Sequence, residues 1–145
     1  CDIFVSYCGY MSEYNSGKID DNDSDDCVVP IYAAVIDTWK WYKARGNTVQ
    51  VSHMGGSGAL PEYVDLYPGC LVFYDYSHDY DPNDNWLDHI GIVTEYDAES
   101  GIITVISGNS YDKSGYSGKY YVAIKTQSAT ADGIYGYAFP EYNHK

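Results

Sequence analysis

The sequence predicts an α+β domain whose N-terminal helices pack on an antiparallel β-sheet of about five strands. Apolar residues recur at helical spacing near the start of the 145-residue chain. Alternating stretches rich in β-branched residues, separated by turn residues, fill most of the remainder. No internal repeat or linker divides the chain. Residues 1–145 are therefore expected to form one domain, with a core large enough to need no metal or disulfide support.

The first predicted helix covers residues 1–14. One apolar stripe of this helix comprises Cys1, Phe4, Val5 and Cys8, and a second comprises Ile3, Tyr7, Tyr10 and Tyr14. A helix that is apolar on two sides is expected to be buried. Its N-terminus carries Cys1, where free backbone amides and the helix dipole would stabilise a thiolate.

A second helix is predicted between Pro30, in its first turn, and Gly46, just past its end. The strands follow a glycine-rich loop, and their succession without further helices indicates an antiparallel meander. The predicted strands cover residues 70–76, 89–97, 102–107, 120–126 and 134–139.

The second and third predicted strands should form a hairpin. If Asp97 pairs with Gly101, counting back along both strands places His89 opposite Asn109, with their Cβ atoms roughly 5 Å apart. A register slip of two residues would bring Ser107 to the same position, because both residues lie on one face of the strand.

A thiol, an imidazole and an orienting amide are the parts of a papain-like nucleophilic site. Cys1, His89 and Asn109 supply them, so the sequence predicts catalysis by a cysteine nucleophile. Each residue also has a structural interpretation: Cys1 as a small buried side chain, His89 as a strand-end residue and Asn109 as a turn residue. The remaining histidines are expected to be solvated in loops or the tail: His53, His78 and His144.

The charge of the chain argues against two classes of partner. The formal net charge is −13 and the pI is near 4.3, so nucleic acids and anionic membrane surfaces would repel the protein. The longest apolar run, residues 27–36, is too short to span a bilayer and contains Pro30. We expect no nucleic-acid partner and no membrane insertion. Because the chain begins within a helical pattern, it is expected to lack a few upstream residues or to come from a longer protein.

No cofactor is expected. The four cysteines, Cys1, Cys8, Cys27 and Cys70, contain no CxxC pair, which disfavours a zinc site. If Cys1 is a free nucleophile, at most one disulfide can form among the other three.

Calcium is only a weak candidate. The first three ligand positions of a calcium-binding loop are matched at Asp21, Asp23 and Asp25, and again at Asp79, Asp81 and Asn83. Neither segment has glycine at the sixth position or glutamate at the twelfth.

Five segments resemble motifs of CHAP domains, the cysteine- and histidine-dependent amidohydrolases/peptidases. Residues 1–9 (CDIFVSYCG) resemble the helix that carries the family's cysteine. The other segments are 68–74 (PGCLVFY, similar to "PGDLVFF"), 89–93 (HIGIV, similar to "HVGIV"), 106–109 (ISGN, similar to "IEGN") and 134–140 (similar to "I.GY..P"). They occur in the family's order and span nearly the whole chain.

The resemblance implies a papain-like fold and hydrolysis of amide bonds in peptidoglycan, as an N-acetylmuramoyl-L-alanine amidase or an endopeptidase. By position, Cys1 would be the nucleophile, His89 the general base and then acid, and Asn109 the polar partner of the imidazole. The chain departs from the family at two positions, since Ser107 replaces a glutamate and Cys70 replaces the aspartate of "PGD". Asn109 would then orient His89, as in the Cys-His-Asn variant of papain-like proteases.

The resemblance also implies a secreted or cell-wall-associated protein of bacterial or phage origin, acting on peptidoglycan or muropeptides without a cofactor. Anionic wall polymers would repel a chain of net charge −13. An additional targeting domain is therefore expected in the parent protein. Which amide bond is cut stays open.

Three other functions fit part of this pattern. A non-catalytic cell-wall-binding module would keep the fold, and the missing glutamate favours it. A host-directed effector peptidase would share the chemistry but act on another target. An N-terminal-nucleophile hydrolase would use the α-amino group of Cys1 as base, but such nucleophiles lie on strands, whereas Cys1 opens a helical pattern.

Overall fold

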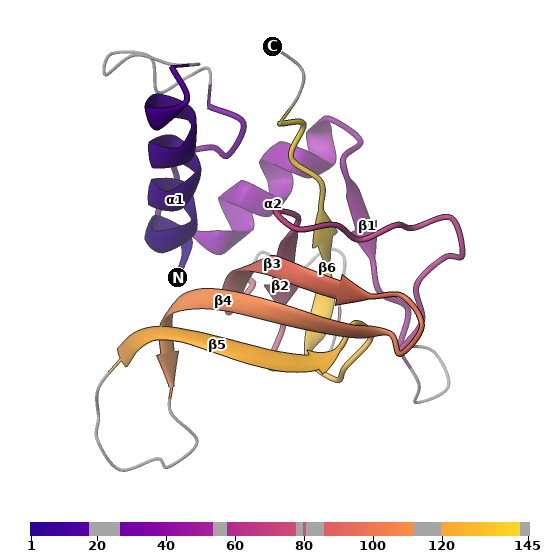
Figure 1. Ribbon diagram of the computed structural model, residues 1–145. Helices are drawn as coiled ribbons and strands as arrows, with labels where there is room; N and C mark the ends of the chain where they lie inside the picture. The colour runs from indigo at the N-terminus through magenta and orange to yellow at the C-terminus, as the bar shows by residue number, and fades with distance from the viewer. Residues whose placement is uncertain (18–26, 54–57, 78–79, 81–85, 112–119, 143–145) are drawn as a thin grey trace.

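The structure, a computed structural model, describes residues 1–17, 27–53, 58–77, 80, 86–111 and 120–142 (Figure 1). The helices in these segments are α1 (Asp2–Asn15) and α2 (Val35–Ala44). The strands are β1 (Thr48–Gln50), β2 (Leu71–Tyr74), β3 (His89–Asp97), β4 (Ile102–Tyr111), β5 (Tyr120–Ser128) and β6 (Ile134–Ala138). The predicted α+β class is confirmed.

The strands form one open antiparallel sheet in the order β1-β6-β2-β3-β4-β5. Strands β2 to β5 follow one another as a meander, and β6 returns to lie beside β2. The sequence predicts no strand at β1, which extends the sheet beyond β6. Its three residues are too few for a period of two to be recognised.

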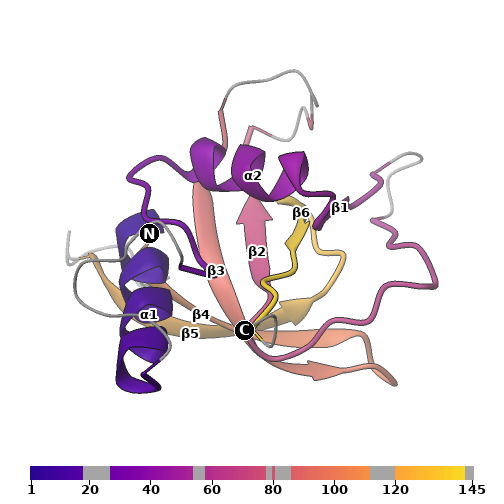
Figure 2. The same cartoon turned by 90° about the horizontal axis from the view of Figure 1, so that it is seen from above.

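Both helices cover one face of the sheet (Figures 1 and 2). Val5 of α1 and Trp39 of α2 are buried in one core with Phe73 and Ile90. The Trp39 ring meets the rings of Phe73 and Tyr135 edge-on, each at a centroid distance of 5.0 Å. Such pairs contribute about 0.5–1.5 kcal/mol each beyond the area they bury. We call this cluster the helix-side core.

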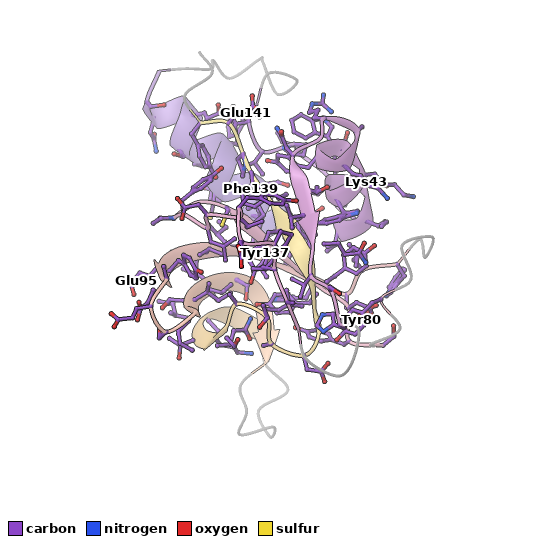
Figure 3. All side chains as sticks on the ribbon, turned by 90° about the vertical axis from the view of Figure 1, so that its right-hand side faces the viewer. Lys43, Tyr80, Glu95, Tyr137, Phe139 and Glu141 are labelled. Atoms are coloured by element: carbon purple, nitrogen blue, oxygen red, sulfur yellow. The ribbon has the colours of Figure 1, made fainter. Side chains whose placement is uncertain are left out.

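The opposite face of the sheet packs on a second core, which is closed by the segment between β1 and β2. Val72 of β2, Val93 of β3 and Val105 of β4 are buried there with Leu66 from that segment. Tyr137 of β6 is fully buried in the same cluster, and Figure 3 shows it in the interior of the molecule. The centre of the sheet is therefore covered on both faces, whereas Val122 and Ile124 of the edge strand β5 are exposed.

Helix α2 begins later than the sequence predicts. Ala34 is its N-cap, with φ −110° and ψ 125°, and Pro30 lies in the segment before the helix. Pro30 is buried, and its carbonyl oxygen accepts a hydrogen bond from Ser6 of α1 (2.9 Å). That tertiary contact overrides the local preference of proline for a first helical turn. Gly46 follows the helix with φ +73°, as expected for a residue that ends a helix.

Helix α1 agrees with its predicted bounds, but only one of its two apolar stripes is buried. Val5 is fully buried, whereas Ile3 and Tyr7 are 69% and 60% exposed. The exposed stripe lines a groove of about 250 Å³ together with Ile31 and Tyr32. The expectation of burial on both sides is wrong because the sheet covers α1 from one side. In the described part of the chain, no helix is long and apolar enough to cross a bilayer.

The hairpin of β3 and β4 differs from the predicted register at its turn and agrees with it further along. Asp97 pairs with Ile102 instead of Gly101. A bulge at Thr94 adds one residue to β3, so that Ile92 pairs with Ile106. The shift of one residue at the turn and the extra residue at the bulge cancel each other. The predicted register is therefore restored at Ile92 and Ile106.

Candidate active site

Cys1 occupies the N-cap of α1. Its carbonyl oxygen accepts the first helical hydrogen bond, from the Val5 amide (3.1 Å). The Cys1 side chain is half-buried against the helix-side core. The amides of the first turn have no partner within the helix, so they can stabilise a thiolate or an oxyanion at this end.

Buried hydrogen bonds fix α1 to the segment that leads into α2. Besides the bond from Ser6 to Pro30, the Val28 amide donates to a carboxylate oxygen of the buried Glu13 (2.7 Å). The Tyr42 hydroxyl of α2 donates to the Val28 carbonyl (2.6 Å). Each such bond contributes about 1 kcal/mol, and together they set the position of the helix that carries Cys1.

A glycine allows α1 to approach the sheet closely. A Cβ atom on Gly108 of β4 would lie 2.6 Å from the Cβ atom of Phe4. On its other side, α1 approaches the segment before α2 through Gly9, whose Cβ atom would lie 2.5 Å from that of Val29. The first turn of α1 therefore lies directly on β4, one residue before Asn109.

Asp2, next to Cys1, links α1 to α2. Its side chain is 2% exposed, and its two carboxylate oxygens lie 3.0 and 3.2 Å from the donating Thr38 hydroxyl. Burial raises the pKa of Asp2 to about 6, and the Thr38 hydrogen bond partly offsets this effect. The residue beside the candidate nucleophile is thus held by a buried polar contact.

His89 is the first residue of β3 and pairs with Tyr74 at the end of β2. The His89 ring lies 5.6 Å from the Tyr74 ring and 6.3 Å from the Tyr76 ring, measured between centroids. The imidazole is therefore half-buried among aromatic side chains.

The pKa of His89 is lowered to about 4. Burial is the main cause, and the positive charges of the Cys1 amino group and of Lys125 add to it, while Asp88 opposes it. His89 is therefore a neutral imidazole at pH 7 and can accept a proton. The effect of the amino group also shows that the start of α1 lies within electrostatic range of His89.

Two opposing pH dependences of stability should appear between about pH 4 and 6.5. The pKa of His89 falls from 6.5 to about 4 on folding, so its contribution to stability is lost as the pH drops through this range. The pKa of Asp2 rises from 3.8 to about 6, so its contribution is lost as the pH rises through this range.

The variant Asp2→Asn separates the two effects. Its free energy of unfolding, measured by urea titration relative to the wild type, should increase by roughly 1–3 kcal/mol from pH 4 to pH 6.5. The same difference for His89→Gln should change in the opposite direction. A difference that does not depend on pH in either variant would contradict the assigned pKa shifts.

Asn109 lies in β4, directly after Gly108. The pairing of β3 with β4 is observed as far as Ile92–Ile106, and β4 is irregular against β5 between Ser107 and Ser110, so the predicted pairing of Asn109 with His89 stays a prediction. The side chain of Asn109 lies outside the described residues. Ser107, the other candidate, is buried with 5% exposure.

The structure thus brings together the start of α1, the start of β3 and the far end of β4. It does not join the two central side chains: Cys1 packs on the helix-side core, whereas His89 pairs with Tyr74, a residue of the second core, and so lies on the opposite face of the sheet. Within the described residues no hydrogen bond links Cys1 to His89.

Three neighbours of His89 were not predicted from the sequence. Tyr76 lies in the turn after β2 and Lys125 lies in β5, and no spacing in the sequence links them to His89. Asp88 directly precedes His89 in the chain, so its position beside His89 could have been predicted from the sequence. Its carboxylate accepts hydrogen bonds from the Trp86 indole (2.8 Å) and the Tyr76 amide (2.7 Å).

His53 is half-buried and hydrogen-bonded, whereas the prediction was a solvated loop residue. Its Nε2 atom lies 2.6 Å from the Ile134 carbonyl oxygen, and its ring stacks on Tyr80 at a centroid distance of 3.8 Å. The predicted loop that carries His53 runs beside β6, which supplies the acceptor. His78 and His144 lie outside the described residues.

The calcium candidates Asp21, Asp23 and Asp25, like Asp79, Asp81 and Asn83, also lie outside the described residues. Within the described segments, no three carboxylate, histidine or cysteine side chains gather as metal ligands would. All four cysteines are free thiols. Burial raises the pKa of Cys8, and it raises the pKa of Cys70 to about 11.

Comparison of the chain with protein-family models, with curated proteins and with solved structures gives no match.

Proposed function

We propose that the chain is a cysteine amidohydrolase or peptidase of the CHAP type, with a papain-like fold, that cleaves amide bonds in peptidoglycan. One observation carries the proposal: the N-cap of α1 is a cysteine, and the first turn of that helix packs on β4, beside the strand that begins with His89. Nucleophilic thiol catalysis needs a cysteine at a position such as a helix start, with a neutral imidazole that can reach it. The five CHAP-like segments, in the family's order, support the choice of substrate.

The low pKa of His89 specifies how the proton would move. Because the imidazole is neutral at pH 7, a thiolate–imidazolium pair is not the resting state. His89 would take the Cys1 proton as the sulfur attacks the amide carbonyl. Amides at the start of α1 would stabilise the oxyanion. The imidazolium would then protonate the leaving amine, and water would hydrolyse the thioester.

Asn109 should affect turnover more than Ser107. An amide opposite His89 can hold the imidazole in one tautomer, whereas a serine hydroxyl donates and accepts in many orientations. We expect Asn109→Ala to lower kcat by at least about tenfold and Ser107→Ala to have a smaller effect. Steady-state kinetics on muropeptides measures both. If Asn109→Ala left kcat unchanged and Ser107→Ala lowered it strongly, the strand ends would pair in a register two residues away from the predicted one.

Incubation with purified cell walls and soluble muropeptides tests the function itself. Mass spectrometry should detect new amino groups and released fragments from amide cleavage, without added metal. Cleavage of a host protein with no muropeptide product would favour an effector peptidase. Binding to walls with no product from any substrate would favour a non-catalytic wall-binding module.

A further inference from the structure

Strand β5 forms one edge of the sheet, and its outer side carries unpaired backbone groups. It is the last strand in the sheet order, and within the described residues no strand other than β4 pairs with it (Figure 1). An edge strand presents a row of N–H and C=O groups on which another strand can pair. The opposite edge, β1, is only three residues long, whereas β5 has nine. The outer side of β5 is therefore the longer of the two edges and can accept a further strand.

The side chains of β5 add an apolar surface to this edge. Val122 is 51% exposed and Ile124 is 68% exposed. Ile124 pairs with Ile106 of β4, and Ile106 pairs with Ile92 of β3, which packs against the helix-side core. These isoleucines form a row across the sheet that ends in solvent at Ile124, and Val122 lies on the same face of β5. A further strand with an apolar residue opposite Ile124 would continue the row.

Few of the features that usually protect an edge strand are present in β5. Prolines, charged side chains and bulges normally prevent unwanted pairing. Strand β5 contains no proline and a single charged residue, Lys125. Its pairing with β4 is irregular between Ser107 and Ser110, but the extra residue belongs to β4, so β5 itself stays regular. The outer side of β5 is therefore suited to pairing.

The apolar residues and the charges of β5 favour a second copy of the same strand. Residues 113–131 contain three lysines and no acidic residue, and all 21 acidic residues lie elsewhere in the chain. A basic peptide would meet these lysines, and an acidic peptide would be repelled by a chain of net charge −13. A second β5 brings no carboxylate to the contact. It also supplies the apolar residues that Val122 and Ile124 lack as partners.

We propose that two copies of the chain pair through β5, antiparallel and about a two-fold axis at Ala123, to form one continuous sheet. In this register Val122 of each copy lies opposite Ile124 of the other, so both exposed residues gain an apolar cross-strand partner. The two Lys125 residues are then four positions apart along the strands, or about 13 Å, which exceeds the Debye length of about 8 Å at 0.15 M salt. The contact is isologous and leaves no part of β5 for a third copy.

A lysine at the centre of the apolar contact tests the surface. Sedimentation equilibrium at about 0.15 M salt should show a monomer–dimer equilibrium for the wild type. Ile124→Lys should raise the Kd of the dimer at least about tenfold. The matched control is Ile3→Lys, because Ile3 is 69% exposed and lies in the groove on α1. That variant should dimerise like the wild type.

The register is tested by a cross-link. Ala123→Cys would place two cysteines opposite each other with Cα atoms about 4.5–5.5 Å apart, a distance that a disulfide spans. Thr126→Cys is the control, because the two introduced residues would lie about 20 Å apart. After mild oxidation, Ala123→Cys should give a covalent dimer linked at position 123, mapped by mass spectrometry, and Thr126→Cys should give none linked at position 126.

The dimer should become tighter with salt, since two copies of net charge −13 repel each other. Its Kd should fall as the ionic strength rises from about 0.01 M to 0.15 M, where the Debye length shortens from about 30 to 8 Å. None of these measurements depends on hydrolase activity.

Three results would overturn the proposal. A wild type that stays monomeric at about 1 mM would leave the edge to a strand of another protein. Loss of the dimer in Ile3→Lys but not in Ile124→Lys would assign the contact to the groove on α1. A covalent dimer from Thr126→Cys but not from Ala123→Cys would contradict pairing about Ala123.

Discussion

Replacing Cys1 with serine should abolish amide hydrolysis, with a loss in kcat/KM of at least about 10³-fold. A serine hydroxyl is a much weaker nucleophile than a thiol, and a neutral His89 with a pKa of about 4 is too weak a base to activate it. His89→Ala should cause a loss of similar size, because the two residues act as one unit and their effects do not add. Release of muropeptide fragments measures both variants.

The matched control for this pair is Cys8→Ser. Cys8 lies further along the same helix, and burial raises its pKa. Its replacement should leave kcat/KM within about twofold of the wild type, since it takes no part in the chemistry. Full activity in Cys1→Ser, or loss of activity in Cys8→Ser with a normally folded protein, would contradict the role of Cys1.

Gly108→Ala should reduce both stability and activity. The new methyl group would lie 2.6 Å from the Phe4 Cβ atom, and both carbons are attached directly to the backbone, so α1 or β4 must move. Overpacking of this kind costs about 1–3 kcal/mol. A displacement of the first turn of α1 by about 1 Å would also lower kcat by about 10²-fold.

The control Gly46→Ala separates these two effects. Gly46 has a φ of +73° and open space around its Cα atom, so alanine there should destabilise the protein by about 1 kcal/mol. It lies after α2, far along the chain from α1 and β4, and kcat should be unchanged. Urea unfolding and steady-state kinetics should be measured on both variants. Equal losses of kcat in both would show that activity follows stability and not the position of α1.

Much of the fold follows from local periodicity. The bounds of β3 match the prediction at both ends, and α1 begins and ends within one residue of it. In these segments the pattern of apolar residues and the tertiary contacts agree. The class, the order of the elements and the meander could therefore be predicted from sequence.

The predictions are wrong where contacts with residues far away in the chain determine the local structure. Pro30 does not start α2, because Ser6 of another helix uses its carbonyl group. Ile3 is exposed although it belongs to an apolar stripe, because the sheet covers only one side of α1. The bulge at Thr94 has no marker in the sequence. Each of these features depends on residues far away along the chain.

The candidate site could be predicted only in part. Counting residue pairs along the predicted hairpin indicates that the end of β4 lies near His89. The apolar stripe of the first predicted helix indicates that Cys1 lies at a helix start. The aromatic surroundings of His89 could not be predicted, since Tyr74 and Tyr76 meet it through the pairing of β2 with β3. These rings bury the imidazole, and burial is the main cause of its low pKa.

The reactivity of the four thiols tests the central claim most directly. The protein provides its own controls, since Cys27 and Cys70 are 4% and 0% exposed and burial raises the pKa of Cys8 and Cys70. The native protein is treated with iodoacetamide at pH 7, and the adducts are mapped by mass spectrometry over time, in the wild type and in His89→Ala. We predict that Cys1 is labelled at least about tenfold faster than any other cysteine and that activity falls in parallel. The variant His89→Ala should be inactive without slower labelling of Cys1, because the imidazole that it lacks is neutral at pH 7. Labelling of Cys1 no faster than that of Cys8, or activity lost while Cys1 is unmodified, would contradict a Cys1–His89 active site.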